Sequence, residues 1–275
     1  MRLDAHQHFW RYSADTYAWI PRDAQALCCD RQPADLWPLL QECGLDGCVA
    51  VQAQQTEGET TCLLAHAAAQ PWIRGVVGWL DMSSDACADQ IAGRQGSALC
   101  GLRHVVQDEA DGFLDAGQID PGLQACANAD LAYDLLIYPR QLPEALRLLD
   151  RHPNLRIVLD HAGKPAIADG GFDAWAPGVQ ALAQRPQLCC KISGLVTEAD
   201  HARWDYATLR PYLDHLLTCF GPERLAFGSD WPVCGLAAAY QAWFRVVDTW
   251  SAAFSASERA ALFGGTAVQW YQLKE

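Results

Sequence analysis

Positive charge is scarce in this chain of 275 residues. Its 20 lysine and arginine residues stand against 33 aspartate and glutamate residues, which gives a formal net charge of −13. Binding to nucleic acid or to an anionic membrane surface needs clustered Lys and Arg. We therefore expect no nucleic-acid partner and no membrane partner. A small-molecule substrate stays open, because a local cationic pocket can exist in an acidic protein.

Long apolar runs are also lacking, and none approaches the ~18 residues of a membrane-spanning helix. The first 20 residues include Asp4, Arg11 and Asp15 and contain no apolar stretch typical of a secretory signal. The 12 cysteines include no C-x-x-C pair, which disfavours a structural zinc site of that kind. These absences together predict a cytoplasmic protein with reduced thiols.

Short apolar segments alternate with helical patterns along the whole chain. Continuous apolar runs such as residues 157–159 are typical of parallel strands that are buried on both faces. Strands are expected at residues 2–8, 46–52, 73–80, 98–106, 132–138, 155–161, 187–193 and 224–230. Eight strands that alternate with helices predict an α/β protein, a single (β/α)8 TIM barrel domain over residues 1–275.

The rival architecture is a doubly wound open sheet, which usually has a glycine-rich phosphate loop after its first strand. Here the first strand ends in His6-Gln7-His8-Phe9, without glycine. Residues 9–35 are long for a strand-to-helix connection and are rich in aromatic residues. Such a loop at the catalytic face forms part of a pocket wall or packs as a small cap, and both interpretations remain open.

Polar residues recur where the expected strands end. In a TIM barrel the active site lies at the carboxyl ends of the strands, so these residues should meet at one end of the barrel. The set contains His6, His8, Arg103, His104, Asp160, His161, Lys164, Lys191, Ser193, Ser229 and Asp230. Such residues would also occur at strand starts and on helices if they were scattered at random, so the pattern favours function.

Strand alternation then assigns side chains to faces. His6 and His8 should point the same way, towards a metal ion or a substrate carbonyl. Asp4 should share their face one layer deeper, either as a partner of the site or as a buried structural carboxylate. Asp230 should point into the barrel, because it shares a face with the small residues of its strand.

Two further strand ends contain a pair of candidates each. Alternation allows only one of Arg103 and His104 to point inward, and we favour Arg103. On the sixth strand, His161 should share the face of Ile157 and Leu159, with Asp160 pointing the other way.

Five motifs stand in one order along the chain: residues 4–10 (DAHQHFW), 101–104 (GLRH), 159–165 (LDHAGKP), 191–195 (KISGL) and 227–232 (FGSDWP). In this order they resemble the amidohydrolase superfamily, in the amidohydrolase 2 branch of sugar-lactone and dicarboxylate-lactone hydrolases. The similarity is greatest to the L-fuconolactonase and L-rhamnonolactonase group. The resemblance spans essentially the whole chain and implies a (β/α)8 barrel that hydrolyses a cyclic ester.

The chain departs from two-metal members of that superfamily. Their bridging lysine on strand four is missing here, since residues 101–104 read GLRH. Their strand-five histidine is also missing, since residues 135–139 read LLIYP. The resemblance therefore implies either a single zinc ion held by His6, His8 and Asp230 or a site in which the metal is dispensable. No nucleotide cofactor is expected.

The expected reaction opens a sugar-acid lactone, such as L-fucono- or L-rhamnonolactone, to the aldonic acid. Asp230 would activate water, while His6, His8 and His161 would polarise the carbonyl directly or through a metal. The expected substrate-binding residues are Arg103, His104, Lys164 and Trp231.

Several alternatives remain beside this prediction. A dicarboxylate lactone would call for more cations at the strand ends, such as Lys191 or Arg140, whereas the 11 tryptophans favour a neutral sugar. The others are a metal-dependent decarboxylase and a non-catalytic barrel that binds sugar acids. Both a monomer and a homo-oligomer are compatible with the sequence.

Overall fold

The computed structural model describes residues 1–274, and over these residues eight parallel strands form one sheet in the order β1 to β8. The strands are β1 (Leu3–Gln7), β2 (Gly47–Val51), β3 (Ile73–Gly78), β4 (Leu99–His104), β5 (Ala132–Leu135), β6 (Ile157–Leu159), β7 (Leu188–Ile192) and β8 (Leu225–Phe227). The sheet closes beyond the end of β8, where Gln7 forms a parallel bridge with Trp231 and the Asp230 N–H donates to the His6 carbonyl at 2.8 Å. The predicted (β/α)8 barrel is confirmed.

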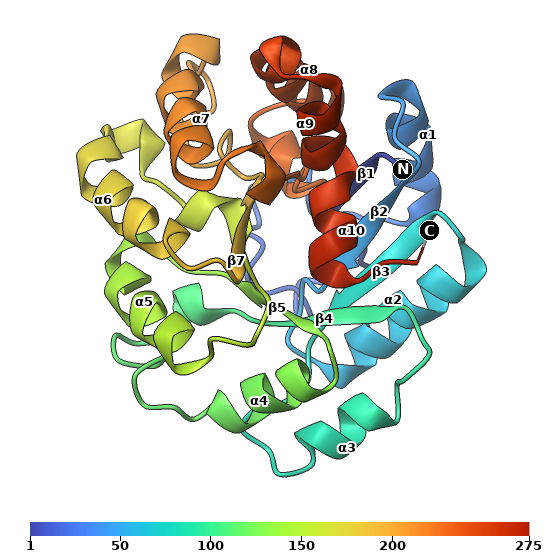
Figure 1. Cartoon of the computed structure of the whole chain (residues 1–275). Helices are drawn as coiled ribbons and strands as arrows, with labels where there is room; N and C mark the ends of the chain where they lie inside the picture. Colours follow the sequence, from blue (N-terminus) through green and yellow to red (C-terminus); the bar gives the residue numbers. More distant parts are fainter. Residues whose placement is uncertain (275) are drawn as a thin grey trace.

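Helices surround this barrel (Figure 1). They are α1 (Pro33–Glu42), α2 (Glu57–Ala69), α3 (Cys87–Ala92), α4 (Asp120–Asn128), α5 (Leu142–Arg151), α6 (Phe172–Ala183), α7 (Tyr206–Phe220), α8 (Tyr240–Trp250), α9 (Ala256–Ala260) and α10 (Thr266–Tyr271). The main core lies between the strands and the helices, where residues such as Leu102, Leu159 and Leu213 are fully buried. Within residues 1–274, no helix has the length and apolar character needed to span a membrane.

A smaller apolar cluster fills the amino-terminal end of the barrel. Leu3, Val158 and Ala226 pack there against Tyr271 of α10 and against Leu273. Figure 1 shows α10 lying across this end. Because the amino-terminal end is closed, a ligand must enter at the carboxyl ends of the strands.

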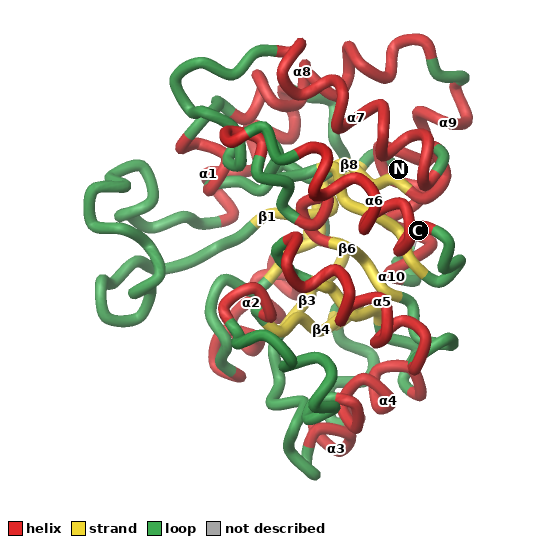
Figure 2. The backbone as a smooth tube through the Cα atoms, turned by 90° about the vertical axis from the view of Figure 1, so that its left-hand side faces the viewer, coloured by secondary structure: helices red, strands yellow, loops and turns green. Residues whose placement is uncertain are grey.

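The connection between β1 and α1 projects from the barrel (Figure 2). Its aromatic and aliphatic side chains form their own cluster of Trp10, Tyr17, Ile20 and Leu27. Trp10 also pairs with Arg31 in an antiparallel bridge, which joins the two ends of the segment. The connection is therefore a packed structure, not a loose loop.

The predicted strands all exist, but each ends one to three residues earlier than expected. The backbone turns into the left-handed region soon after β6 and β8, with φ of 52° at His161 and 59° at Asp230. Such φ values are uncommon for residues other than glycine and are typical of functional sites. The 12 cysteines, all of which lie within residues 1–274, are free thiols, as expected for reduced cysteines.

Candidate active site

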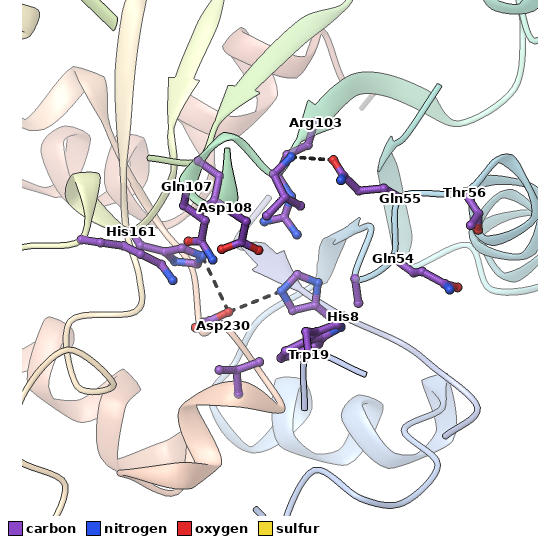
Figure 3. A pocket seen from close by; sticks show the side chains of 15 residues that line it. His8, Trp19, Gln54, Gln55, Thr56, Arg103, Gln107, Asp108, His161 and Asp230 are labelled. Carbon is purple, nitrogen blue, oxygen red and sulfur yellow. Dashed lines mark hydrogen bonds and ion pairs between the residues drawn. The ribbon is translucent and has the colours of Figure 1, made fainter. Parts of the chain in front are cut away.

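A cavity of about 370 Å³ lies at the carboxyl ends of the strands. Figure 3 shows that the His8 and His161 side chains point towards Asp230, with Arg103 across the same space. The cavity is lined by His8, Trp19, Ala53, Gln54, Gln55, Thr56, Arg103, Val105, Gln107, Asp108, Leu136, His161, Lys164, Asp230 and Val233. The ends of β1, β4, β6 and β8, four of the five strand ends that the sequence analysis singled out, thus supply groups to one space.

His6 and His8 meet as expected, with 3.2 Å between their Nε2 atoms. The strand is irregular between Asp4 and Gln7, where its register with β2 shifts. The barrel also makes room for the His6 ring, because a Cβ atom on Gly228 would lie only 2.8 Å from the Cβ of His6. A glycine at residue 228 is therefore needed for this position of His6.

The same irregularity gives Asp4 a different position from the predicted one, in which it shared the face of the two histidines. Asp4 faces away from the cavity, where its carboxylate accepts hydrogen bonds from the Ser229 N–H at 2.8 Å and from the Tyr240 hydroxyl at 3.0 Å. Strict alternation fails because the register shift between Asp4 and Gln7 breaks the two-residue period. Asp4 is thus the buried structural carboxylate of the two possibilities.

Asp230 lies among three imidazole rings. Its Oδ1 atom is 3.4 Å from His8 Nε2 and 3.9 Å from the Nε2 atoms of both His6 and His161. Burial alone would raise the pKa of Asp230, but His161, His8 and His6 together hold this pKa well below its ordinary value. The carboxylate is therefore ionised at neutral pH.

His161 reaches the cavity through its left-handed backbone conformation. Its Nδ1 atom lies 2.9 Å from the Ser193 hydroxyl, and a Cβ atom on Gly194 would come within 2.8 Å of its ring. Burial lowers the pKa of His161 to about 4, although Asp230 and Asp160 oppose this shift. The ring is therefore neutral at neutral pH.

Asp160 also points into the barrel, which corrects the prediction that it points the other way. Its carboxylate is 3.0 Å from Arg103 Nη1, 3.0 Å from Lys191 Nζ and 3.2 Å from His6 Nδ1. Asp160 continues the alternation of β6, and the positive φ of His161 brings the next side chain inward as well. Both members of the pair therefore face the site.

Lys191 is fully buried beneath the histidines. Its ammonium group lies 2.6 Å from Asp134 and 3.0 Å from His6 Nδ1. Burial would lower the pKa of Lys191, but Asp134 and Asp160 raise it above its ordinary value. Lys191 is thus charged and belongs to an ion-pair layer under the cavity, not to the substrate space.

The structure brings together some of the expected substrate-binding residues and separates others. Arg103 and Lys164 line the cavity. His104 does not, because its ring stacks on Phe113 and its Nε2 lies 2.8 Å from Glu109. The side chain of Trp231 also lies outside this lining and is buried against Phe9.

The sequence analysis missed one wall of the cavity. Gln54, Gln55 and Thr56 follow β2 and line the cavity, and Trp19 approaches from the β1–α1 connection (Figure 3). The rule that selected the other strand ends would also have found the polar residues 52–56. Trp19 had no comparable signal, because it is one of several aromatic residues in its segment.

The histidines and Asp230 suit a metal ion. Two ligands about 2.0–2.1 Å from a tetrahedral zinc ion lie roughly 3.3 Å apart. The separations here are 3.2 Å between His6 and His8, 3.4 Å between His8 and Asp230, and a longer 3.9 Å between His6 and Asp230. His8 Nδ1 faces the Val51 carbonyl at 2.8 Å, which can only accept, so Nε2 keeps its lone pair for a metal. His161 lies close enough to join His6 and Asp230 in a second possible ligand set.

One charged neighbour opposes metal binding. Arg103 Nη1 lies 3.4 Å from His6 Nε2, so a guanidinium cation stands beside the atom that would bind the ion. The donor set is therefore suitable in spacing and chemistry, whereas the local charge lowers its affinity for a cation.

Comparisons with known proteins agree with this architecture. The family model described as amidohydrolase matches residues 3–273. An L-fucono-1,5-lactonase from Burkholderia multivorans is 42% identical over 100% of this chain and 97% of its own length. An L-fucono-1,5-lactonase from Burkholderia ambifaria is 39% identical over 99% of this chain and 96% of its own.

The crystal structure of an amidohydrolase from Burkholderia multivorans with bound zinc is also similar. It is 42% identical, covers 100% of both chains and superposes with a TM-score of 0.96. The family predicted from the five motifs is confirmed, and with it the prediction of a hydrolase. The chain belongs to the amidohydrolase family.

Proposed function

We propose that the protein hydrolyses the cyclic ester of a neutral sugar lactone, such as L-fuconolactone or L-rhamnonolactone, to the open-chain aldonic acid. The observation that carries this proposal is the Asp230 carboxylate, ionised and surrounded by three imidazoles at the floor of a cavity of about 370 Å³. The names of the two lactonases that are 42% and 39% identical over nearly their whole lengths support it.

Asp230 is the proposed base. It takes a proton from water as the water oxygen attacks the lactone carbonyl carbon. The ring C–O bond then breaks, and protonated Asp230 returns its proton to the departing ring oxygen, which becomes a hydroxyl group of the aldonic acid. Arg103, which lines the cavity and is permanently charged, stabilises the oxyanion; one such donor contributes about 3 kcal/mol.

A zinc ion bound by His6, His8 and Asp230 would add Lewis-acid polarisation of the carbonyl. The protein's own groups supply part of this effect, since Arg103 and His161 line the same cavity. A lactone is also an activated ester and needs less assistance than an amide. We therefore expect activity to fall only in part when the metal is removed.

Charge in the cavity favours a neutral substrate over a dicarboxylate. Arg103 is 3.0 Å from Asp160, and Lys164 is 3.6 Å from Glu198, so both cations already have an anionic partner. Trp19 offers an apolar face for a sugar ring, and Gln54 and Gln107 offer amides for ring hydroxyls. A second carboxylate on the substrate would find no unpaired cation among these lining residues.

A panel of lactones tests the proposal. Acid release is measured for L-fuconolactone, L-rhamnonolactone, their stereoisomers and a dicarboxylate lactone, each with and without prior dialysis against a chelator. We expect fastest turnover of a neutral sugar lactone and residual turnover after chelation. Turnover of the dicarboxylate alone would overturn the substrate class, and stabilisation by a sugar acid without any turnover would indicate a binding protein. Complete loss of turnover on chelation, with full recovery when zinc is added, would overturn the proposal that the metal is dispensable.

A further inference from the structure

The wall of the substrate cavity formed by Ala53–Thr56 has hollow space on both sides. A second cavity of about 300 Å³ lies behind it, and Gln54 and Thr56 line both cavities. A segment between two cavities has few packing contacts to hold it in place. Its position must therefore depend on specific hydrogen bonds.

Glu59 supplies those hydrogen bonds. It is the third residue of α2, whose N-cap is Thr56. A glutamate at this position usually returns to the N–H of the cap residue, completing a capping box. Here the Thr56 N–H donates to the Gln54 carbonyl instead, and Glu59 Oε2 accepts from the backbone N–H groups of Ala53, at 3.1 Å, and of Gln54.

The other carboxylate oxygen of Glu59 reaches a different segment. Oε1 accepts a hydrogen bond from the Tyr17 hydroxyl at 3.3 Å. Tyr17 belongs to the β1–α1 connection and lies two residues before Trp19, which lines the substrate cavity. One side chain, only 8% exposed, thus joins two segments that form the same wall.

We propose that Glu59 is a positioning residue that sets substrate affinity by holding the Ala53–Thr56 wall against the Tyr17 segment. Glu59 itself does not line the substrate cavity, so it acts through the residues it binds. This inference rests on the proposed function for its substrate, but the hydrogen bonds that carry it do not.

The protonation of Glu59 gives the wall a dependence on pH. Burial raises the pKa of Glu59 to about 7, although the bonds from Gln54, Ala53 and Tyr17 and the charge of Arg103 lower it. Cys62, His66 and Arg11 are the other ionisable groups that line the cavity behind it. Protonation turns an acceptor into a donor, so the wall is held best above about pH 7 and loosens below it.

The test compares Glu59→Gln with Glu57→Gln. Glu57 lies on the same helix, but its carboxylate bonds Gln90 and Arg94, away from the wall. For the lactone that the wild type hydrolyses fastest, we expect Glu59→Gln to raise KM about tenfold and to change kcat by less than about twofold. The wild-type KM should rise as pH falls through about 7, whereas the KM of Glu59→Gln should not follow pH and Glu57→Gln should behave as wild type.

Hydrogen exchange gives a readout that does not depend on turnover. The amide hydrogens of Ala53 and Gln54 should exchange faster in Glu59→Gln than in the wild type and in Glu57→Gln. Unchanged protection of these two amides overturns the proposal, and so does a loss of kcat at constant KM. If no lactone is hydrolysed, the proposed function fails, and the Kd of L-fuconate replaces KM; equal Kd values for the wild type and Glu59→Gln then overturn the role of Glu59.

Discussion

Lys191 Nζ lies 3.0 Å from His6 Nδ1, beneath the floor of the cavity. An ammonium group can only donate, so His6 Nδ1 accepts and a neutral His6 ring carries its proton on Nε2. That proton faces His8 Nε2 at 3.2 Å, and His8 donates from Nδ1 to the Val51 carbonyl. The bonds from Lys191 to Val51 thus form a chain without a metal ion, but in it the Nε2 proton of His6 also faces Arg103 Nη1 at 3.4 Å, and a guanidinium can only donate.

Asp160 gives His6 Nδ1 an alternative partner, one that accepts a hydrogen bond from this nitrogen. Its Oδ1 atom is buried and lies 3.2 Å from His6 Nδ1 and 3.0 Å from Lys191 Nζ. If His6 donates from Nδ1 to Asp160, its Nε2 lone pair becomes available to a metal. Lys191 and Asp160 thus compete for the same ring nitrogen, with opposite consequences for metal binding.

Asp160→Asn should therefore weaken zinc binding by about tenfold to 100-fold, the usual effect of losing a carboxylate that orients a histidine ligand. Zinc affinity is measured by competition with a chromophoric chelator. The matched control is Asp134→Asn, because Asp134 also pairs with Lys191 but bonds Tyr271 on its other side. Equal losses of affinity in both variants would show that only the charge counts, and not the bond to His6.

Asp230→Asn should lower kcat by about 10²-fold to 10⁴-fold, because the amide cannot take a proton from water. The fold should survive, which circular dichroism and the melting temperature would check. Asp108→Asn is the matched control, since Asp108 lines the same cavity (Figure 3) but is not among the carboxylates that pair with the three histidines of the site. We expect that variant to change KM and leave kcat nearly intact. A folded Asp230→Asn enzyme with a near-normal kcat would remove Asp230 from the mechanism.

The sequence was sufficient for the barrel and for the convergence of four polar side chains at one end of it. Apolar segments, several of them continuous, marked the strands, and polar strand ends marked His6, His8, His161 and Asp230. These successes have one physical origin, since parallel strands buried on both faces must be apolar until they reach the active-site end.

The failures come from places where the backbone leaves regular geometry. Alternation misplaced Asp4 because of the register shift in β1. It also put Asp160 and His161 on opposite faces, whereas the positive φ of His161 brings both side chains inward. Trp19 and Glu59 depend on how a long connection packs against the β2–α2 loop. No local pattern encodes such a contact between distant segments, so it emerged only from the structure.

Asp4 should make stability depend on pH. Burial raises its pKa to about 6 in the folded chain, despite hydrogen bonds from Ser229, His6 and Tyr240, compared with the ordinary value of 3.8. The folded state thus binds the proton more tightly than the unfolded state. The stability that this gives is complete below about pH 4 and is lost as pH rises through about 6.

Asp4→Asn should remove this dependence, because the amide is neutral at every pH. As pH rises from about 3 to about 7, the free energy of unfolding of the variant should gain about 3 kcal/mol relative to the wild type. Urea denaturation at several pH values measures the difference, with the exposed Asp89→Asn as a control. A constant difference across this range would mean that Asp4 titrates alike in both states.

The pH dependence of kcat should differ from that of KM. The pKa of Asp230 is held well below its ordinary value, and that of His161 is lowered to about 4, so the base is ionised and the ring neutral over the whole range from about pH 8 to about pH 5. In chelator-treated enzyme at saturating lactone, kcat should accordingly stay nearly flat over this range, whereas KM rises towards acid as Glu59 is protonated. The lactone must be corrected for its spontaneous opening at each pH, with Asp230→Asn as the blank. A fall in kcat with a midpoint between about pH 6 and pH 7 would assign the base to a group with an ordinary histidine pKa, and not to Asp230.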